Sequence, residues 1–485
     1  MKNFTSVLRS HSGAVQARIP SLRSVTNQKS THPFYKVCRW LMVLLVLTIS
    51  MPVLAEVTLT SNNCQYEILG TEGSRYLKIV FIKANGEVRV PDRMAVPIDD
   101  KKVSLSVKEV VAESGDNKVT KYIFEPNIEK VEIVGRYNPS VKSVIFEGDN
   151  TQVAFAFHNG DPLEEIRLPA NITQFGITTW HGASSFSNCK TLKSVILPEK
   201  LEEIRTSLFE GCSALTTLVI PNTVTKIGTD AFKESGLTQI TLPESLTTIE
   251  ASAFYKTKLE TITIPKNVTK IPTDCFYQCE NLIRAMFPNT LTTIDARAFR
   301  GCSNLANIDI PTSLETIGIG AFGDCKNLKL TNQFRFPNSM KEIGEAAFEN
   351  CTQLGINQLI FPGNMENANI GGFINCDVTH VIVEEGAKTV TLPSNKYIKS
   401  ITLPKTVSKL TGYLIEAKEL ESFVIDEDAP LTEIGALTFY KCTKLKSFIC
   451  PKSVTKIGGM AFSECSALET VKLPEGITSI GDRAF

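Results

Sequence analysis

The sequence contains few of the residues and motifs that enzymes and metalloproteins usually use for catalysis and metal binding. Its 485 residues include five histidines and two tryptophans. Three histidines, His158, His181 and His380, follow residue 55, and none has a partner at the spacing of a catalytic or metal motif. The sequence also has no H-E-x-x-H, no G-x-S-x-G, no phosphate-binding loop, no dinucleotide fingerprint and no C-x-x-C pair. We therefore expect no catalytic residues, no metal and no cofactor.

The apolar run near the N-terminus is too short for a comfortable membrane span. It covers residues 40–49, follows Lys36 and Arg39, and precedes Val53-Leu54-Ala55, which has the form of a signal cleavage site. A transmembrane helix needs about 20 apolar residues. We interpret residues 1–55 as a signal peptide with a long basic leader, which predicts a secreted or cell-surface protein. An uncleaved membrane anchor is the alternative.

The chain also lacks an excess of positive charge. Lysine plus arginine equals aspartate plus glutamate, at 51 each. Residues 1–55 hold seven basic residues and no acidic one, so 44 basic side chains then face 51 acidic ones, a net charge of −7. Nucleic-acid surfaces are usually basic. We therefore expect no nucleic-acid partner.

What the sequence does have is a repeat of about 23 residues from Leu163 to Phe485. Its consensus is L-x-x-I-x-[LI]-P-x-x-[LV]-x-x-I-x-x-x-A-F-x-x-C-x-x-L. The first part alternates and is rich in β-branched residues, which predicts a short strand that ends at the proline. The A-F-x-x-C part predicts about one helical turn with its phenylalanine inward. A fixed period in this range indicates stacked units, so we predict a solenoid of parallel strands.

The repeat divides the chain into three parts. After the signal peptide, residues 56–140 do not repeat, and they predict a β-rich N-terminal capping module. Residues 141–485 predict a solenoid of about 14 rungs, starting with a degenerate rung at 141–146. The sequence stops at Ala484-Phe485 in mid-unit. From this we expect an incomplete C-terminus, because stable repeat proteins close their last rung.

These motifs resemble the leucine-rich repeats of BspA-like bacterial surface proteins. The order I-P-x-x-V-x-x-I-G-x-x-A-F-x-x-C is nearly intact from Ile220 to Ser235 and from Cys450 to Cys465. The resemblance implies a leucine-rich-repeat solenoid, a surface or secreted location, and binding to extracellular matrix or neighbouring cells. The unit beginning at Val378 is short and lacks Phe-x-x-Cys. We therefore expect a kink or bulge near residues 328–398.

Most cysteines occupy one slot of the repeat. Nine lie three residues after the repeat phenylalanine: Cys189, Cys212, Cys279, Cys302, Cys325, Cys351, Cys376, Cys442 and Cys465. Ser235 and Thr257 take the same slot in two other units, so the slot accepts small side chains that form weak hydrogen bonds. Parallel Cβ vectors about 4.8 Å apart are too distant for a disulfide, which needs about 3.8 Å. We therefore predict a ladder of reduced structural thiols.

Two places could contact a ligand. The outward strand position predicts a contact ridge: Ile196, Val219, Thr241, Thr263, Met286, Asp309, Arg335 and Ile360, continuing to Lys472. An apolar and β-branched ridge suits a protein contact, although strands favour these residues anyway. The second place is Trp180 with His181, in an insertion that could equally be a packed irregular loop.

These observations favour an exported, non-enzymatic, adhesin-like protein that binds a protein ligand through one solenoid face. A glycan-binding or structural envelope component is one alternative, although sugar sites usually use exposed tryptophan or tyrosine, and one of the two tryptophans lies in the signal. Another alternative is an accessory part of a longer protein whose functional C-terminal domain is missing.

Overall fold

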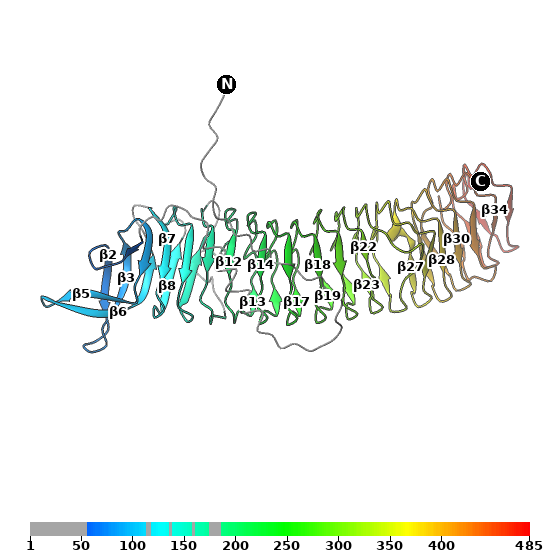
Figure 1. The fold of residues 1–485 in the computed structure, drawn as a ribbon. Helices are drawn as coiled ribbons and strands as arrows, with labels where there is room; N and C mark the ends of the chain where they lie inside the picture. The colour runs from blue at the N-terminus through cyan, green and yellow to red at the C-terminus, as the bar shows by residue number, and fades with distance from the viewer. Residues whose placement is uncertain (1–55, 113–117, 135–137, 158–160, 174–185) are drawn as a thin grey trace, which may run out of the picture. The chain divides into compact units, whose positions relative to one another are not determined.

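The computed structural model describes residues 56–112, 118–134, 138–157, 161–173 and 186–485, which belong to the unit Leu54–Phe485. The predicted signal peptide lies outside the described residues. Within the described residues the chain winds as a solenoid of about 15 turns built from short parallel strands (Figure 1). One short 3-10 helix, η2 (Ile370–Phe373), occurs among them. The prediction of a repeat solenoid of leucine-rich-repeat type is therefore confirmed.

Each turn contributes a first strand, and together these strands form what we call the strand face. The first strands are β11 (Glu165–Arg167), β12 (Ser194–Ile196), β14 (Thr217–Val219), β16 (Gln239–Thr241), β18 (Thr261–Thr263), β20 (Arg284–Met286), β22 (Asn307–Ile308), β24 (Gln333–Arg335), β26 (Gln358–Phe361), β28 (His380–Val383), β30 (Ser400–Leu403), β32 (Ser422–Ile425), β34 (Ser447–Ile449) and β36 (Thr470–Lys472). In the three-residue strands the middle residue points toward the core, as at Leu218 and Ile262, and in the four-residue strands β26, β28, β30 and β32 the second and fourth residues are buried.

Each turn then contributes a second, usually shorter strand. These are β13 (Glu203–Ile204), β15 (Lys226–Ile227), β17 (Thr248–Ile249), β19 (Lys270–Ile271), β21 (Thr293–Ile294), β23 (Thr316–Ile317), β25 (Glu342–Ile343), β27 (Asn367–Asn369), β29 (Thr389–Leu392), β31 (Lys409–Gly412), β33 (Glu433–Ile434), β35 (Lys456–Ile457) and β37 (Ser479–Ile480). They pair in parallel with their neighbours, as in β19-β21-β23-β25. In most turns a proline separates the first from the second strand, because it cannot donate to the ladder; β28 and β29 are joined without one.

The corner after the proline is held by a side chain that the sequence pattern did not identify. A serine or threonine two residues after the proline donates its hydroxyl to a carbonyl of the preceding turn. Thr223 donates to the Leu201 carbonyl at 2.7 Å, and Ser313 donates to the Leu291 carbonyl at 2.6 Å. A buried carbonyl without a partner is costly, so these hydroxyls let the chain change direction inside the stack.

The A-F-x-x-C segments form a third side, the turn face. Their phenylalanines stack in a continuous column from Phe186 to Phe373, with ring centroids 4.8–5.7 Å apart. Backbone bonds also link the turns, as from the Phe299 amide to the Ala321 carbonyl at 2.7 Å. The segments are irregular rather than helical, because two residues per turn have positive φ, such as Ser252 at 56° and Lys256 at 53°.

The phenylalanine column is interrupted where the repeat was expected to be irregular. The turn that carries β29 has no Phe-x-x-Cys, and Asn395 is buried there instead. Its side-chain amide donates to the Phe373 carbonyl at 2.9 Å and to the Cys376 carbonyl at 3.0 Å. In most other turns the carbonyl of the repeat phenylalanine accepts a hydrogen bond from the cysteine thiol of the next turn, as Phe276 does from Cys302. Here Asn395 takes the place of that cysteine as the donor. The column resumes at Phe439, which stacks on Phe462 at 5.0 Å.

Residues 56–156 contribute ten further strands. They are β1 (Val57–Thr58), β2 (Cys64–Leu69), β3 (Tyr76–Ile82), β4 (Gly86–Val90), β5 (Arg93–Ile98), β6 (Lys101–Ala112), β7 (Val119–Phe124), β8 (Lys130–Val134), β9 (Ser143–Phe146) and β10 (Gln152–Ala156). The parallel sheet β1-β4-β7-β9-β11-β12 runs across residue 140 into the repeats. Only β2 on β3 and β5 on β6 pair in antiparallel fashion among the described strands. The boundary at residue 140 stays a prediction.

Candidate functional site

The structure brings most of the ridge residues into one register on the strand face. Val219 lies opposite Thr241, Thr263 opposite Met286, and Arg335 opposite Ile360. The column continues through Ile382, Thr402 and Val424, and Ile449 lies opposite Lys472. Asp309 follows the end of β22 and lies outside the paired ladder. That these residues contact a ligand stays a prediction.

The apolar ridge residues differ in how far they face solvent. Val219 is 61% exposed, Val424 is 51% exposed and Ile449 is 44% exposed. Ile196 and Ile360 are half-buried. Large apolar side chains this exposed, recurring along one face, are a feature of contact surfaces.

A second outward column lies beside the ridge, and sequence reasoning missed it. It holds mostly small neutral polar side chains: Ser194, Thr217, Gln239, Thr261, Arg284, Asn307, Gln333, Gln358, His380, Ser400, Ser422, Ser447 and Thr470. Strand alternation was the available signal, because every second residue faces the same side. The ridge column also extends toward the N-terminus through Ile145, Ile123 and Arg89.

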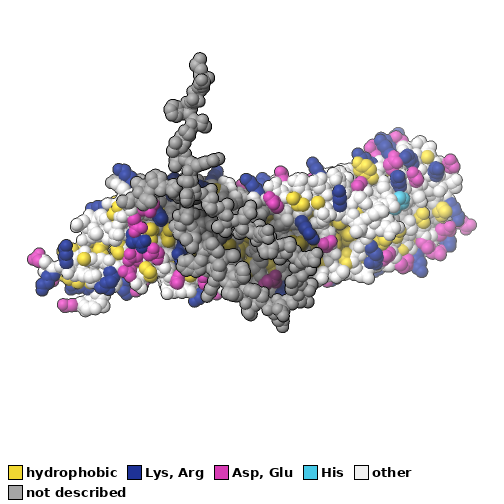
Figure 2. All heavy atoms as spheres, viewed as in Figure 1, with side chains coloured by type: hydrophobic (Ala, Val, Ile, Leu, Met, Phe, Trp, Pro, Cys, Tyr) yellow, Lys and Arg dark blue, Asp and Glu magenta, His cyan; other side chains and the backbone are white. Residues whose placement is uncertain are grey.

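Charge separates the strand face from the rest of the surface. From Ser194 to Met286 the two outward columns hold ten residues, and Arg284 is the charged one. The second strands carry ion pairs instead. Lys226 lies 3.2 Å from Glu203 and 2.8 Å from Glu250. Figure 2 shows basic and acidic side chains intermixed on the coloured surface. The central strand face thus offers a surface with one charged residue among ten, on a molecule that is otherwise rich in charges.

Two cross-turn ion pairs bound the C-terminal part of the ridge. The Arg335 guanidinium binds Glu384 through both carboxylate oxygens, at 2.9 and 2.7 Å. This hydrogen bonding holds the pKa of the Glu384 carboxyl below its usual value. At the other end, the Lys472 ammonium lies 3.4 Å from Glu427. Arg335 pairs with a carboxylate two turns later in the chain, and Lys472 pairs with one two turns earlier. Both cations therefore point toward the turns that lie between β24 and β36.

The repeat cysteines lie inside the core. The twelve described cysteines are free thiols, and all are buried. Eight of the nine repeat cysteines donate to a main-chain carbonyl of the preceding turn, as Cys302 does to Phe276 at 3.1 Å. Burial raises the pKa of Cys279 to about 11 and that of Cys212 to about 12. Neutral buried thiols are unreactive. Their purely structural role stays a prediction.

The remaining candidates add no second site. Trp180 and His181 lie outside the described residues. His380 is half-buried, and its Nδ1 lies 2.9 Å from the Thr379 hydroxyl and 3.1 Å from the Asn357 carbonyl oxygen. Within the described part of the chain there is no cluster of three or more histidine, cysteine or acidic side chains that could hold a metal ion. Across the same residues no helix is long and apolar enough to span a membrane.

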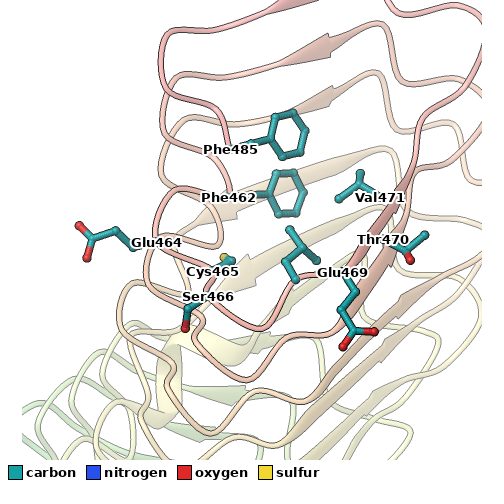
Figure 3. A pocket seen from close by; sticks show the side chains of 9 residues that line it. Phe462, Glu464, Cys465, Ser466, Glu469, Thr470, Val471 and Phe485 are labelled. Atoms are coloured by element: carbon teal, nitrogen blue, oxygen red, sulfur yellow. The ribbon is translucent and has the colours of Figure 1, made fainter.

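A hollow of about 290 Å³ lies at the last turn, lined by Phe462, Cys465, Leu468, Val471 and Phe485 among others (Figure 3). The Phe462 and Phe485 rings stack there, with centroids 5.4 Å apart. These are core positions of the repeat, which the following turn covers elsewhere in the solenoid. We therefore propose no ligand site in this hollow.

The arrangement defines a repeat protein of the leucine-rich class, and comparison with family models gives the family. The model described as the BspA type leucine rich repeat region, with six copies, matches residues 150–283, 269–392 and 393–485. The matches span more than half of the chain. The protein belongs to the BspA-type leucine rich repeat family, as its motifs predicted.

Solved structures of leucine-rich repeat proteins are similar to this chain. One from Bacteroides ovatus is 20% identical, with 87% of this chain and 90% of that chain covered and a TM-score of 0.49. A leucine rich cell surface protein from Faecalibacterium prausnitzii is 20% identical, with 84% and 92% covered and a TM-score of 0.33. The pneumococcal vaccine antigen PcpA is 18% identical, with 76% and 98% covered and a TM-score of 0.41. No curated protein matched the chain.

Proposed function

We propose that this protein is an exported, non-enzymatic binding protein that holds a protein ligand on its strand face, in the manner of an adhesin. The observation that carries the proposal is the ridge of exposed apolar side chains, in register along a face with few charges. Leucine-rich-repeat solenoids generally serve as binding scaffolds, and a stacked sheet offers an extended surface rather than a pocket. Export rests on residues 1–55, and matrix or cell surfaces are the expected partners.

On the central part of the strand face, between Ser194 and Met286, the ligand is expected to bind mainly by apolar and neutral polar contacts. Interface cores are depleted in charged residues, and the outward columns between Ser194 and Met286 have this composition. This part of the face should therefore contribute little to long-range steering by charge.

The proposal can be tested with the full chain on an array of matrix proteins, whole cells and glycans. The ridge variant Val219→Lys is compared with Ile319→Lys, because both side chains are 61% exposed and Ile319 lies beyond β23, off the strand face. We expect a protein ligand whose affinity falls at least tenfold with Val219→Lys and less than twofold with Ile319→Lys. Binding to glycans alone, to nothing, or equal losses in both variants would contradict the proposal.

A further inference from the structure

The C-terminal part of the ridge has features that indicate the kind of partner, provided that the proposed function holds. We call this part the apolar section: Ile360, Ile382, Thr402, Val424 and Ile449. Its first four members are paired in register on β26, β28, β30 and β32. The ion pairs of Arg335 and Lys472 lie at its two ends. The section is therefore a bounded stripe, one side chain wide.

One long edge of the stripe is acidic. Immediately after strands β28, β30, β32 and β34 the chain carries five carboxylates and two lysines: Glu384, Glu385, Lys405, Asp426, Glu427, Asp428 and Lys452. We call these residues the acidic rim. The edge before the same strands and β26 carries Asn357, Thr379, Lys399, Glu421 and Lys446, with two lysines and one glutamate. A partner should therefore be basic on one flank and nearly neutral on the other.

The spacing of the stripe decides which backbone can follow it. Neighbouring turns lie about 4.8 Å apart, so the five residues span about 19 Å. An α-helix presents one side chain per turn of about 5.4 Å, which drifts from the ridge by about 0.6 Å per step. An extended strand repeats every 6.6–6.8 Å on one side and drifts by about 2 Å per step. After four steps the helix is about half a rung out of register, whereas the strand has slipped by more than one rung.

We propose that the apolar section binds an amphipathic α-helix of a partner protein, about 13 residues long, with a basic flank. The helix lies along the solenoid axis and packs an apolar stripe of i, i+3 and i+4 residues on Ile382, Val424 and Ile449. Its lysine or arginine side chains face the acidic rim. Three rim carboxylates are already paired: Glu384 with Arg335, Glu427 with Lys472 and Asp428 with Lys452. Glu385 and Asp426 are exposed and make no ion pair among the described residues, so these two are the carboxylates that meet the partner's cations.

A designed peptide tests the inference on the full chain. The probe is a fluorescent 16-residue peptide with leucine at every third or fourth position, lysine along one flank, and alanine and glutamine elsewhere. The controls are a scrambled peptide of the same composition and the probe with a central proline. By fluorescence anisotropy we expect the probe to bind at least tenfold more tightly than either control. Equal affinities for the probe and the scrambled peptide would overturn the inference.

Variants then locate the site and the orientation. We expect Val424→Lys to weaken probe binding at least tenfold, whereas Ile319→Lys, a matched apolar residue off the strand face, leaves it unchanged. Glu385→Lys should weaken the lysine-flanked probe severalfold and favour a glutamate-flanked one. Loss of binding with Ile319→Lys, or no effect of Val424→Lys, would contradict the inference. If the array finds a ligand that depends on Val219 but the probe does not bind, this inference fails and the proposed function stands.

Discussion

On the turn face the apolar side chains are buried against their neighbours in adjacent turns, whereas on the strand face several large apolar side chains remain exposed to solvent. Each turn-face phenylalanine from Phe209 to Phe348 is fully buried between two others. Outward charges there pair across turns, as Arg297 does with Asp274 at 2.7 Å. On the strand face, Val219 and Val424 remain more than half exposed. The two faces of each turn thus differ in role: the turn face stabilises the stack, and the strand face is available to a partner.

The largest expected difference between the two faces concerns stability. Phe299→Ala should lower the free energy of unfolding by about 3–5 kcal/mol, because it removes a fully buried ring that stacks on two neighbours. Met286→Ala on the strand face should change it by less than about 0.5 kcal/mol. Urea denaturation followed by circular dichroism measures both. Similar losses in the two variants would remove the distinction between the faces.

The buried thiols predict that stability falls in alkaline solution. Burial raises the pKa of Cys64, Cys279 and Cys450 to about 11, above the ordinary thiol value of 9.0. The folded state therefore favours the neutral thiol, and this contribution is complete below pH 9 and is lost as the pH rises toward 11. In that window, each such thiol should lower the free energy of unfolding by about 1.4 kcal/mol for every pH unit.

Urea midpoints measured from pH 7.5 to 10.5 test this dependence. We expect little change up to pH 8.5 and a steep decline above pH 9. A midpoint that stays constant to pH 10.5 would contradict the neutral, buried state of these thiols.

A smaller effect is expected where the thiol ladder is imperfect. The hydroxyl of Ser235 is buried and has no hydrogen-bond partner among the residues that the structure describes. Cysteine tolerates burial better and could donate to the preceding turn as its neighbours do, so Ser235→Cys should stabilise the fold by about 1 kcal/mol. Ser235→Ala should be neutral or slightly stabilising, and thermal unfolding of the three proteins gives the comparison. Clear destabilisation by Ser235→Ala would show that the hydroxyl has a partner.

The smallest effect belongs to the ion pair on the ridge. Arg335 and Glu384 have side chains 39% and 38% exposed, so solvent screens their attraction. Arg335→Gln should lower the free energy of unfolding by less than about 1 kcal/mol, and the difference should shrink in 1 M salt. Urea midpoints of both proteins at low and high salt are the measurement. A loss of several kcal/mol would place this pair among the core interactions.

Much of this architecture could be read from the sequence, because the repeat makes each turn predict the next. The strand, the proline and the inward phenylalanine follow from periodicity. The positive φ angles at Ser252 and Lys256 could not be predicted, because neither residue type favours that conformation. Asn395 was missed since its partners, the Phe373 and Cys376 carbonyls, lie about 20 residues away.

The ridge shows where sequence reasoning reaches its limit at the candidate site. Alternation placed Val219 and Thr241 side by side, and their pairing has the same register in the structure. Alternation does not show which charges meet. The pair between Arg335 and Glu384 joins residues 49 positions apart, and it depends on the stacking of two successive turns. Bounded sections of the strand face therefore became visible only in three dimensions.

Footprinting of the full chain with its captured ligand tests the central claim most directly. Hydroxyl radicals oxidise methionine and tyrosine, and the two faces carry Met286 and the stacked pair Tyr255 and Tyr277 respectively. The account predicts that the ligand protects Met286 while oxidation of both tyrosines is unchanged. Protection of the tyrosines with Met286 still reactive would contradict it, because the ligand would then lie on the turn face.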